Sequence, residues 1–199
     1  AGTAAAPHTV RFNTGAQYIT FQDMHIRGMN ATNAYAVHVF GNAIGLEFKR
    51  CNITTASSTS YTNVPVMFAA SLSNYTPGVA ASDILIEDNY IYGGTDGLVI
   101  TSTSTSTTFA AATHSDNIRI LRNRIVNQNG GAGWGAIHMR YVRNVTVDGN
   151  FMGVEGSGTQ VGGYYATYFI NLLSAPGLPN RINNNVINAA QTGSAYYFS

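Results

Sequence analysis

Acidic and basic side chains are scarce in this chain, so any chemistry must come from few positions. Nine Asp and Glu, ten Lys and Arg and five His occur in 199 residues. A carboxylate near an imidazole can act as an acid/base pair, and Asp96, His138 and Arg140 could form such a small polar site. These three are the candidate catalytic residues. The alternative for Asp96 is structural, because an Asp-Gly pair also favours a turn before a strand.

Tyr90, Arg124 and Phe151 form a second set, in which two aromatic rings flank a guanidinium. They are separated by 34 and 27 residues. If they lie on neighbouring strands, cation–π contacts of about 0.5 to 1 kcal/mol each would stabilise the strand surface. The same flat strip could instead stack sugar rings or bind the edge of another protein. Tyr90, Arg124 and Phe151 are therefore the candidate ligand-binding residues.

The elements that must position these residues come from an internal repeat. The phrase Asn144 to Met152, NVTVDGNFM, alternates Val145 and Val147 with polar residues, turns at Asp148-Gly149, and enters a second short strand. Five other stretches resemble it: 19–26, 46–53, 84–91, 118–125 and a degenerate copy at 181–187. The copies are 27 to 38 residues apart, which is typical of a solenoid with loops of variable length.

A third strand is expected after each copy, so that each coil has three strands. The candidate third strands are Tyr35 to Phe40, Val64 to Phe68, Gly97 to Ile100, Gly135 to Met139, Ala166 to Leu172 and Ala195 to Phe198. No helical apolar pattern accompanies them, so parallel strands must bury their apolar faces against one another. The prediction is an all-β, right-handed single-stranded parallel β-helix of about six coils.

Two columns of side chains should run through the coils. One aliphatic position is occupied by Ile26, Ile53, Ile91, Ile125, Met152 and Ile187, and we expect it to be buried. Asn89, Asn123, Asn150 and Asn185 share a position at the bend, where Asn tolerates a left-handed backbone and its amide can bond from coil to coil. A buried Cys51 takes that position in an earlier coil. Asp23, Arg50, Asp88 and Arg122 alternate in charge beside it, which favours correct register.

The same repeat separates the groups that catalysis would need. The other carboxylates fall at different corners, so neither a calcium site nor a carboxylate pair is expected. His38 and His138 share an outward position three coils apart, about 14 Å, too far to share a metal. We expect all five histidines, His114 among them, at the surface, and we expect no metal and no cofactor. The third-strand face could be a floor between irregular walls, with insertions 69–83 and 101–117 side by side.

NVTVDGNFM and SDNIRILRNRIV resemble coils of the right-handed parallel β-helix superfamily, which includes pectate lyases, polygalacturonases, phage tailspikes and bacterial surface proteins. They are especially similar to β-helix segments of large secreted bacterial proteins. The resemblance covers almost the whole chain and implies the fold and an extracellular or cell-surface location. It carries no catalytic residue, because the consecutive Asp pair and the Gly-His-Gly and Arg-Ile-Lys motifs of polygalacturonases are absent.

Composition limits the partners. Charged residues make up 10% of the chain, the net charge is +1 and Lys49 is the single lysine, which argues against nucleic acid. No stretch has the roughly 20 apolar residues of a membrane-spanning helix. Thr9 to Phe12 and Ala195 to Phe198 each read as a strand of an incomplete coil. We therefore expect one domain over residues 1–199, a segment of a longer protein that meets adjoining coils or domains.

The sequence thus favours a non-catalytic, rigid stalk or adhesin-like scaffold that contacts carbohydrate or other surface proteins. Two alternatives stay open. One is a polysaccharide lyase or glycoside hydrolase whose site lies partly outside this segment, and the other is a carbohydrate-binding module.

Overall fold

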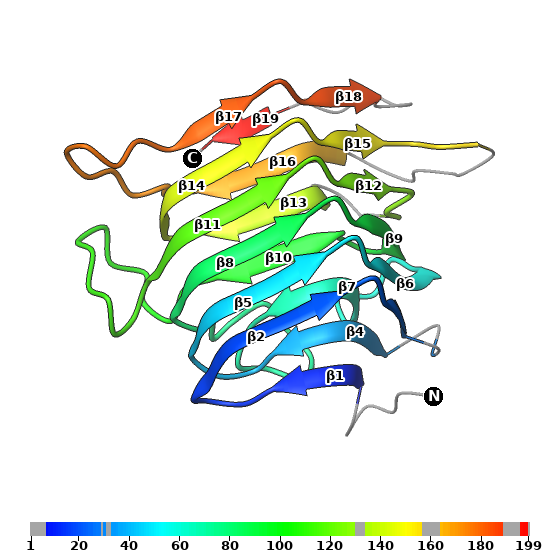
Figure 1. The fold of residues 1–199 in the computed structure, drawn as a ribbon, viewed down its shortest axis with the longest axis horizontal. Coiled ribbons are helices and arrows are strands. Elements are labelled where there is room, and N and C mark those ends of the chain that lie inside the picture. Colours follow the sequence, from blue (N-terminus) through cyan, green and yellow to red (C-terminus); the bar gives the residue numbers. More distant parts are fainter. Residues whose placement is uncertain are drawn as a thin grey trace.

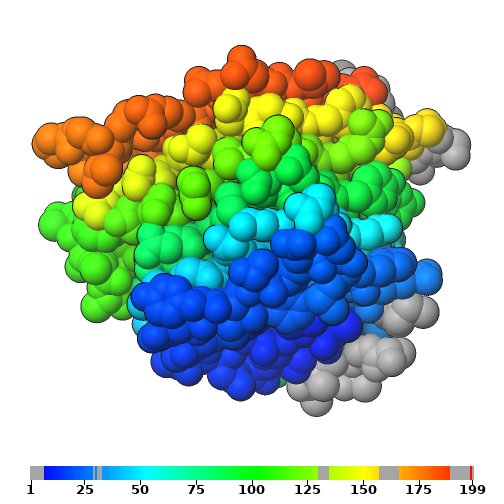
Figure 2. Space-filling view, in the orientation of Figure 1, coloured from blue at the N-terminus to red at the C-terminus, as the bar shows by residue number. Residues whose placement is uncertain are grey.

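The computed structural model describes residues 7–28, 30, 33–129, 134–156, 164–188 and 196–198. Its strands form three parallel sheets in which each strand pairs with the equivalent strand of the next coil (Figure 1). Successive coils appear as bands from blue to red on the space-filling surface (Figure 2). The fold is a parallel β-helix of about six coils, as predicted, and the described residues include no helix.

The first two strands of each coil build sheets B and C. Sheet B contains β2 (Ala16–Gln22), β5 (Ala43–Lys49), β8 (Ala81–Glu87), β11 (Ser115–Leu121), β14 (Val142–Asp148) and β17 (Arg181–Asn183). Sheet C contains β3 (His25–Arg27), β6 (Asn52–Ser57), β9 (Tyr90–Gly94), β12 (Arg124–Val126), β15 (Phe151–Gly153) and β18 (Val186–Asn188). The predicted repeat phrase therefore spans one strand of each sheet and the bend between them.

The third strands build sheet A. Its members are β1 (His8–Phe12), β4 (Ala34–Val39), β7 (Asn63–Phe68), β10 (Leu98–Thr101), β13 (Trp134–Arg140), β16 (Tyr164–Ile170) and β19 (Tyr196–Phe198). These bounds agree with the predicted third strands to within two residues at most positions. β4 and β7 are buried at every position, so both faces of sheet A are covered there.

The aliphatic column lies in register as predicted. Ile26 pairs with Ile53, and the pairing continues through Ile91, Ile125, Met152 and Ile187 on successive strands of sheet C. The first five are at most 3% exposed, and Ile187 in the last coil is partly buried. Side chains in such a column are removed from water by both neighbouring coils, so each stabilises the fold by about 1.5–3 kcal/mol.

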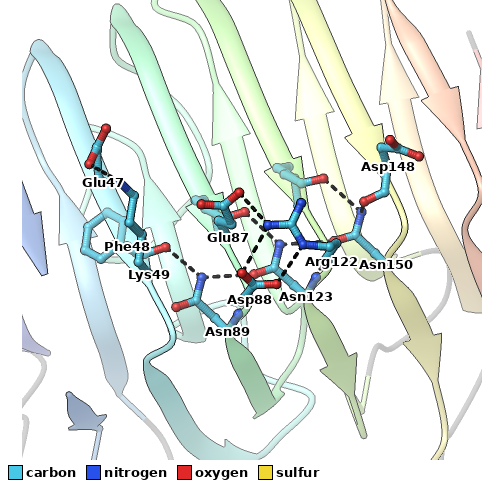
Figure 3. Close-up of polar contacts among 12 residues, drawn as sticks. Glu47, Phe48, Lys49, Glu87, Asp88, Asn89, Arg122, Asn123, Asp148 and Asn150 are labelled. Carbon is cyan, nitrogen blue, oxygen red and sulfur yellow. Dashed lines mark hydrogen bonds and ion pairs between the residues drawn. The ribbon is translucent and has the colours of Figure 1, made fainter. Parts of the chain in front are cut away.

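The asparagine ladder, Asn89, Asn123, Asn150 and Asn185, bonds from coil to coil, and Figure 3 shows its first three members. Each side-chain amide of the first three donates to the next carbonyl oxygen at 2.9–3.0 Å. The side-chain oxygens of all four asparagines also accept a backbone N–H from the preceding coil, and the donor to Asn89 is Cys51, whose thiol is buried. Buried amides that are satisfied in this way fix the register of the bend.

The left-handed residue at this bend is not the asparagine, which corrects the sequence interpretation. It is the preceding position, where Asp23, Arg50, Asp88 and Arg122 have φ of 50–56°. A left-handed backbone at these residues costs conformational free energy, but their side chains carry the charges that form ion pairs between coils. Arg50 contacts Asp23 at 2.8 Å. Figure 3 shows the pairs of Arg122, which contacts Asp88 at 2.9 Å and Glu87 at 2.7 Å. Because the paired groups are exposed, solvent screens their attraction and each pair adds little to stability.

Candidate functional site

The candidate catalytic residues lie on the outer side of sheet A, under a cover. Segment 69–80 joins β7 to β8 and carries Tyr75, which is 3% exposed. The Tyr75 hydroxyl donates a hydrogen bond to one oxygen of Asp96, and the backbone N–H of Gly135 donates to the other oxygen at 2.7 Å. The Tyr75 ring also packs edge-on against His138, with centroids 5.2 Å apart. Tyr75 therefore contacts both candidates.

Burial determines the protonation of both groups. It raises the pKa of Asp96 to about 7, although the hydrogen bonds from Tyr75 and Gly135 pull in the opposite direction. Burial also lowers the pKa of His138 to about 3, with a further contribution from Arg140. Both side chains are 0% exposed, and Arg140 is half-buried on the same strand as His138. Near neutrality the imidazole is uncharged and the carboxyl group is close to its midpoint.

A polymer has no route to Asp96 or His138 in this arrangement, because segment 69–80 and Tyr75 cover them. General acid/base catalysis requires the catalytic group within hydrogen-bond reach of the substrate proton. The expected open floor on the third-strand face is therefore absent over the middle coils. Insertions 69–83 and 101–117 do lie side by side, since Val79 N–H donates to the Thr101 carbonyl at 2.8 Å.

Three of the histidines differ from the surface placement expected from sequence. His38 and His138 share one row of sheet A in register, as predicted, but both are 0% exposed. His38 Nε2 donates to the Ala69 carbonyl at 2.9 Å, which ties the covering segment to β4. His114, 2% exposed, bonds Ser106 and Ala110 and organises the second insertion. Within the described ranges, no three His, Cys, Asp or Glu side chains are grouped to hold a metal.

Sheet C presents an open outer face, where the candidate ligand-binding residues lie. Tyr90, Arg124 and Phe151 are paired on neighbouring strands, as their spacing predicted. The Arg124 guanidinium stands 4.5 Å from the centroid of Phe151 and is paired with Glu155 at 2.7 Å. Glu155 is thus an additional member of the strip. The expected sandwich between two rings is not formed, because Tyr90 lies beside Tyr92 instead, with nearly parallel rings 6.2 Å apart.

This pair of tyrosines forms one wall of a groove along β6. The opposite wall is His25 and Arg27 on β3, and both are exposed. The floor between them consists of the shorter Asn52 and Thr54, which pair directly with residues of both walls. The open volume is about 330 Å³. The wall-to-wall separation is two coil spacings, about 10 Å.

The groove combines aromatic faces with hydrogen-bonding groups of several kinds. Tyr90 and Tyr92 offer apolar ring surface, Asn52 and Thr54 offer amide and hydroxyl groups, and Arg27 offers a guanidinium fork. Sequence reasoning found Tyr90 but missed Tyr92, Arg27 and the short floor. The available signal was the two-residue period of a strand, which places Tyr92 on the same face as Tyr90.

Comparisons of this chain with protein-family models, with curated proteins and with solved structures gave no match. Among the described residues, no helix combines the length and apolar character needed to cross a membrane.

Proposed function

We propose that this protein is a non-catalytic segment of a secreted or cell-surface bacterial β-helix protein, a rigid scaffold that binds carbohydrate on sheet C. The observation that carries the proposal is the groove along β6. Its tyrosine wall, short polar floor and opposing Arg27 provide both the flat apolar faces and the hydroxyl-binding groups that a saccharide needs.

Rigidity supports this assignment. A flexible saccharide chain loses conformational freedom when it binds. A site that hydrogen-bonded strands already hold in place adds no further cost for ordering the protein. The walls and floor belong to β3, β6 and β9, which pair with one another along sheet C, and the aliphatic column fixes their inner face. The adjoining strip of Arg124, Phe151 and Glu155 extends the surface along the stack.

The test is an array of neutral and acidic oligosaccharides, followed by calorimetric titration of the best ligand. Tyr92→Ala removes one wall and is expected to weaken binding by about tenfold or more, since a lost stacking contact of about 1.4 kcal/mol corresponds to that factor. Tyr61→Ala is the matched control, because Tyr61 is also exposed but lies outside the groove. Equal binding by both variants would contradict the site.

The non-catalytic part has its own measurement. The purified chain is incubated with the polysaccharides from which bound oligosaccharides derive, with and without calcium. We expect no release of reducing or unsaturated ends. Release that disappears in Asp96→Asn or His138→Gln would support the lyase or hydrolase alternative instead.

A further inference from the structure

A second groove lies on the outer face of sheet B, on a different side of the coil from the groove of sheet C. It has an open volume of about 380 Å³. Its lining comes from β2, β5, β8 and β11 and consists of Tyr18, Thr20, Gly45, Glu47, Asp83, Asn117 and Arg119. These residues take no part in the function proposed above.

The hollow arises from a column of left-handed residues inside sheet B. Tyr18, Gly45, Asp83, Asn117 and Asn144 are in register on five successive strands, with φ between 52° and 65°. Gly, Asp and Asn are the residue types that adopt this conformation readily. Tyrosine is not, because a bulky side chain at positive φ is a genuine outlier. Tyr18 therefore costs backbone energy that its equivalents in the other coils avoid, of order 1 kcal/mol.

Burial does not offset this cost, since Tyr18 is 77% exposed. Its ring lies against the backbone of Gly45 in the next coil. A methyl group built on Gly45 would lie 2.7 Å from Cδ1 of Tyr18, so only glycine leaves room for the ring. The ring thus covers the bare backbone of Gly45 and leaves most of its surface to solvent. A strained, exposed aromatic residue is what a binding platform requires and what stability alone disfavours.

The polar groups around the ring are balanced in charge. Glu47 accepts from Thr20 at 3.1 Å and pairs with Lys49 at 2.6 Å, and Asp83 accepts from Asn117 at 2.6 Å. Arg119 is exposed and has no ion pair within the described part of the chain. Two carboxylates, the Lys49 ammonium and the Arg119 guanidinium leave no net charge for a charged ligand to neutralise.

We infer that this groove binds a neutral saccharide, with one sugar ring on Tyr18 and its hydroxyl groups bonded by Asp83, Glu47 and Arg119. Carboxylates accept from hydroxyl groups and the guanidinium donates to them, so together they suit a polyhydroxylated ligand. An acidic saccharide would meet Glu47 and Asp83, and a basic one would meet Arg119 and Lys49. The site is independent of the sheet C groove and stands whether or not that groove binds carbohydrate.

The test uses three neutral hexasaccharides, of β-linked glucose, β-linked mannose and β-linked galactose, titrated against the whole chain. We expect at least one to bind, and Tyr18→Asn to weaken it by about tenfold or more. Asparagine suits the left-handed backbone, so this variant is expected to unfold at the same or a higher urea concentration than the wild type. Loss of binding could then not be ascribed to loss of fold.

Arg119→Gln provides a second probe that keeps a donor but removes the charge-assisted bonds, with an expected loss of about three- to tenfold. Tyr92→Ala is the control that separates the two grooves, because it removes the sheet C wall and leaves sheet B intact. Failure of all three hexasaccharides to bind, or equal binding by wild type and Tyr18→Asn, would overturn the inference. Binding lost only in Tyr92→Ala would overturn it too and would support the sheet C groove.

Discussion

The outer faces of sheets A and C are built from the same repeat, but the outer face of sheet A is covered and that of sheet C is exposed. On sheet A the outward row containing His38, Met67, Val99 and His138 is sealed by segment 69–80. On sheet C the outward row containing Asn52, Tyr90 and Arg124 stays open, because segment 69–80 covers sheet A instead. The position of an insertion, rather than the coil itself, determines which face can meet a ligand.

Polar groups follow the same division. Under the cover, Asp96 and His138 are held in their uncharged forms or near the midpoint by burial. On sheet C, Arg124 and Glu155 remain charged and paired, and the pKa of Glu155 is lowered by its hydrogen bond to Arg124. The covered face thus uses polar groups for structure, and the open face keeps them available.

The largest expected effect is at Tyr75. Tyr75→Ala removes a buried ring and leaves the Asp96 carboxyl without its hydroxyl partner, so we expect a loss of about 3–5 kcal/mol in the free energy of unfolding. Tyr92→Ala on the open face should cost less than about 1 kcal/mol. Urea unfolding of both variants measures the contrast. Comparable losses in the two variants would show that the cover formed by segment 69–80 contributes no more to stability than a tyrosine on the open face.

The pH dependence of stability provides a second contrast, from the groups beneath the cover. The raised pKa of Asp96 means that its native state holds a proton which the unfolded state releases, so stability falls as pH rises from about 4 to about 7. His38 and His138 act in the opposite sense. Burial lowers their pKa values to about 4 and about 3, so stability falls as pH drops below about 6.5.

Between pH 4.5 and 6.5 the two histidines together outweigh the single carboxyl. We therefore expect stability to rise by about 1 kcal/mol per pH unit near pH 5, slightly less than one net proton, and then to level off towards pH 7. Asp96→Asn should steepen the rise to about two protons near pH 5 and keep stability rising through pH 6.5, where the wild type levels off. Unfolding curves at half-unit pH steps measure both slopes. Identical profiles for wild type and Asp96→Asn would contradict the buried titration.

Periodicity explains which of these features the sequence could reveal. An aliphatic residue such as Ile53 or Ile91 recurs at one position of every coil, and an asparagine such as Asn123 recurs at another position in four coils. The aliphatic column and the asparagine ladder could therefore be predicted before any coordinates. Tyr75 could not, because segment 69–80 has no repeat and its contact with Asp96 spans 21 residues of chain. The burial of His138 was missed for the same reason.

Left-handed positions were missed for a different reason. Asp88 and Asp83 carry positive φ in an otherwise extended chain, and polar residues at strand positions do not reveal their backbone angles. The expected left-handed asparagine was therefore placed one residue too late. The platform of Tyr18 on Gly45 was invisible as well, since nothing in a strand pattern indicates that the two residues touch across coils.

The smallest expected effect concerns the strip beyond the sheet C groove. Arg124→Met keeps much of the side-chain volume against Phe151 but removes the ion pair with Glu155. The pair is exposed and screened by salt, so we expect a change of less than about 1 kcal/mol that shrinks further between 0.05 and 0.5 M salt. Thermal unfolding at both salt concentrations measures it, with Glu155→Gln as the matched partner. A loss above about 2 kcal/mol would mean that the strip is a structural clamp like the covered face, and that Arg124 is not available to a ligand.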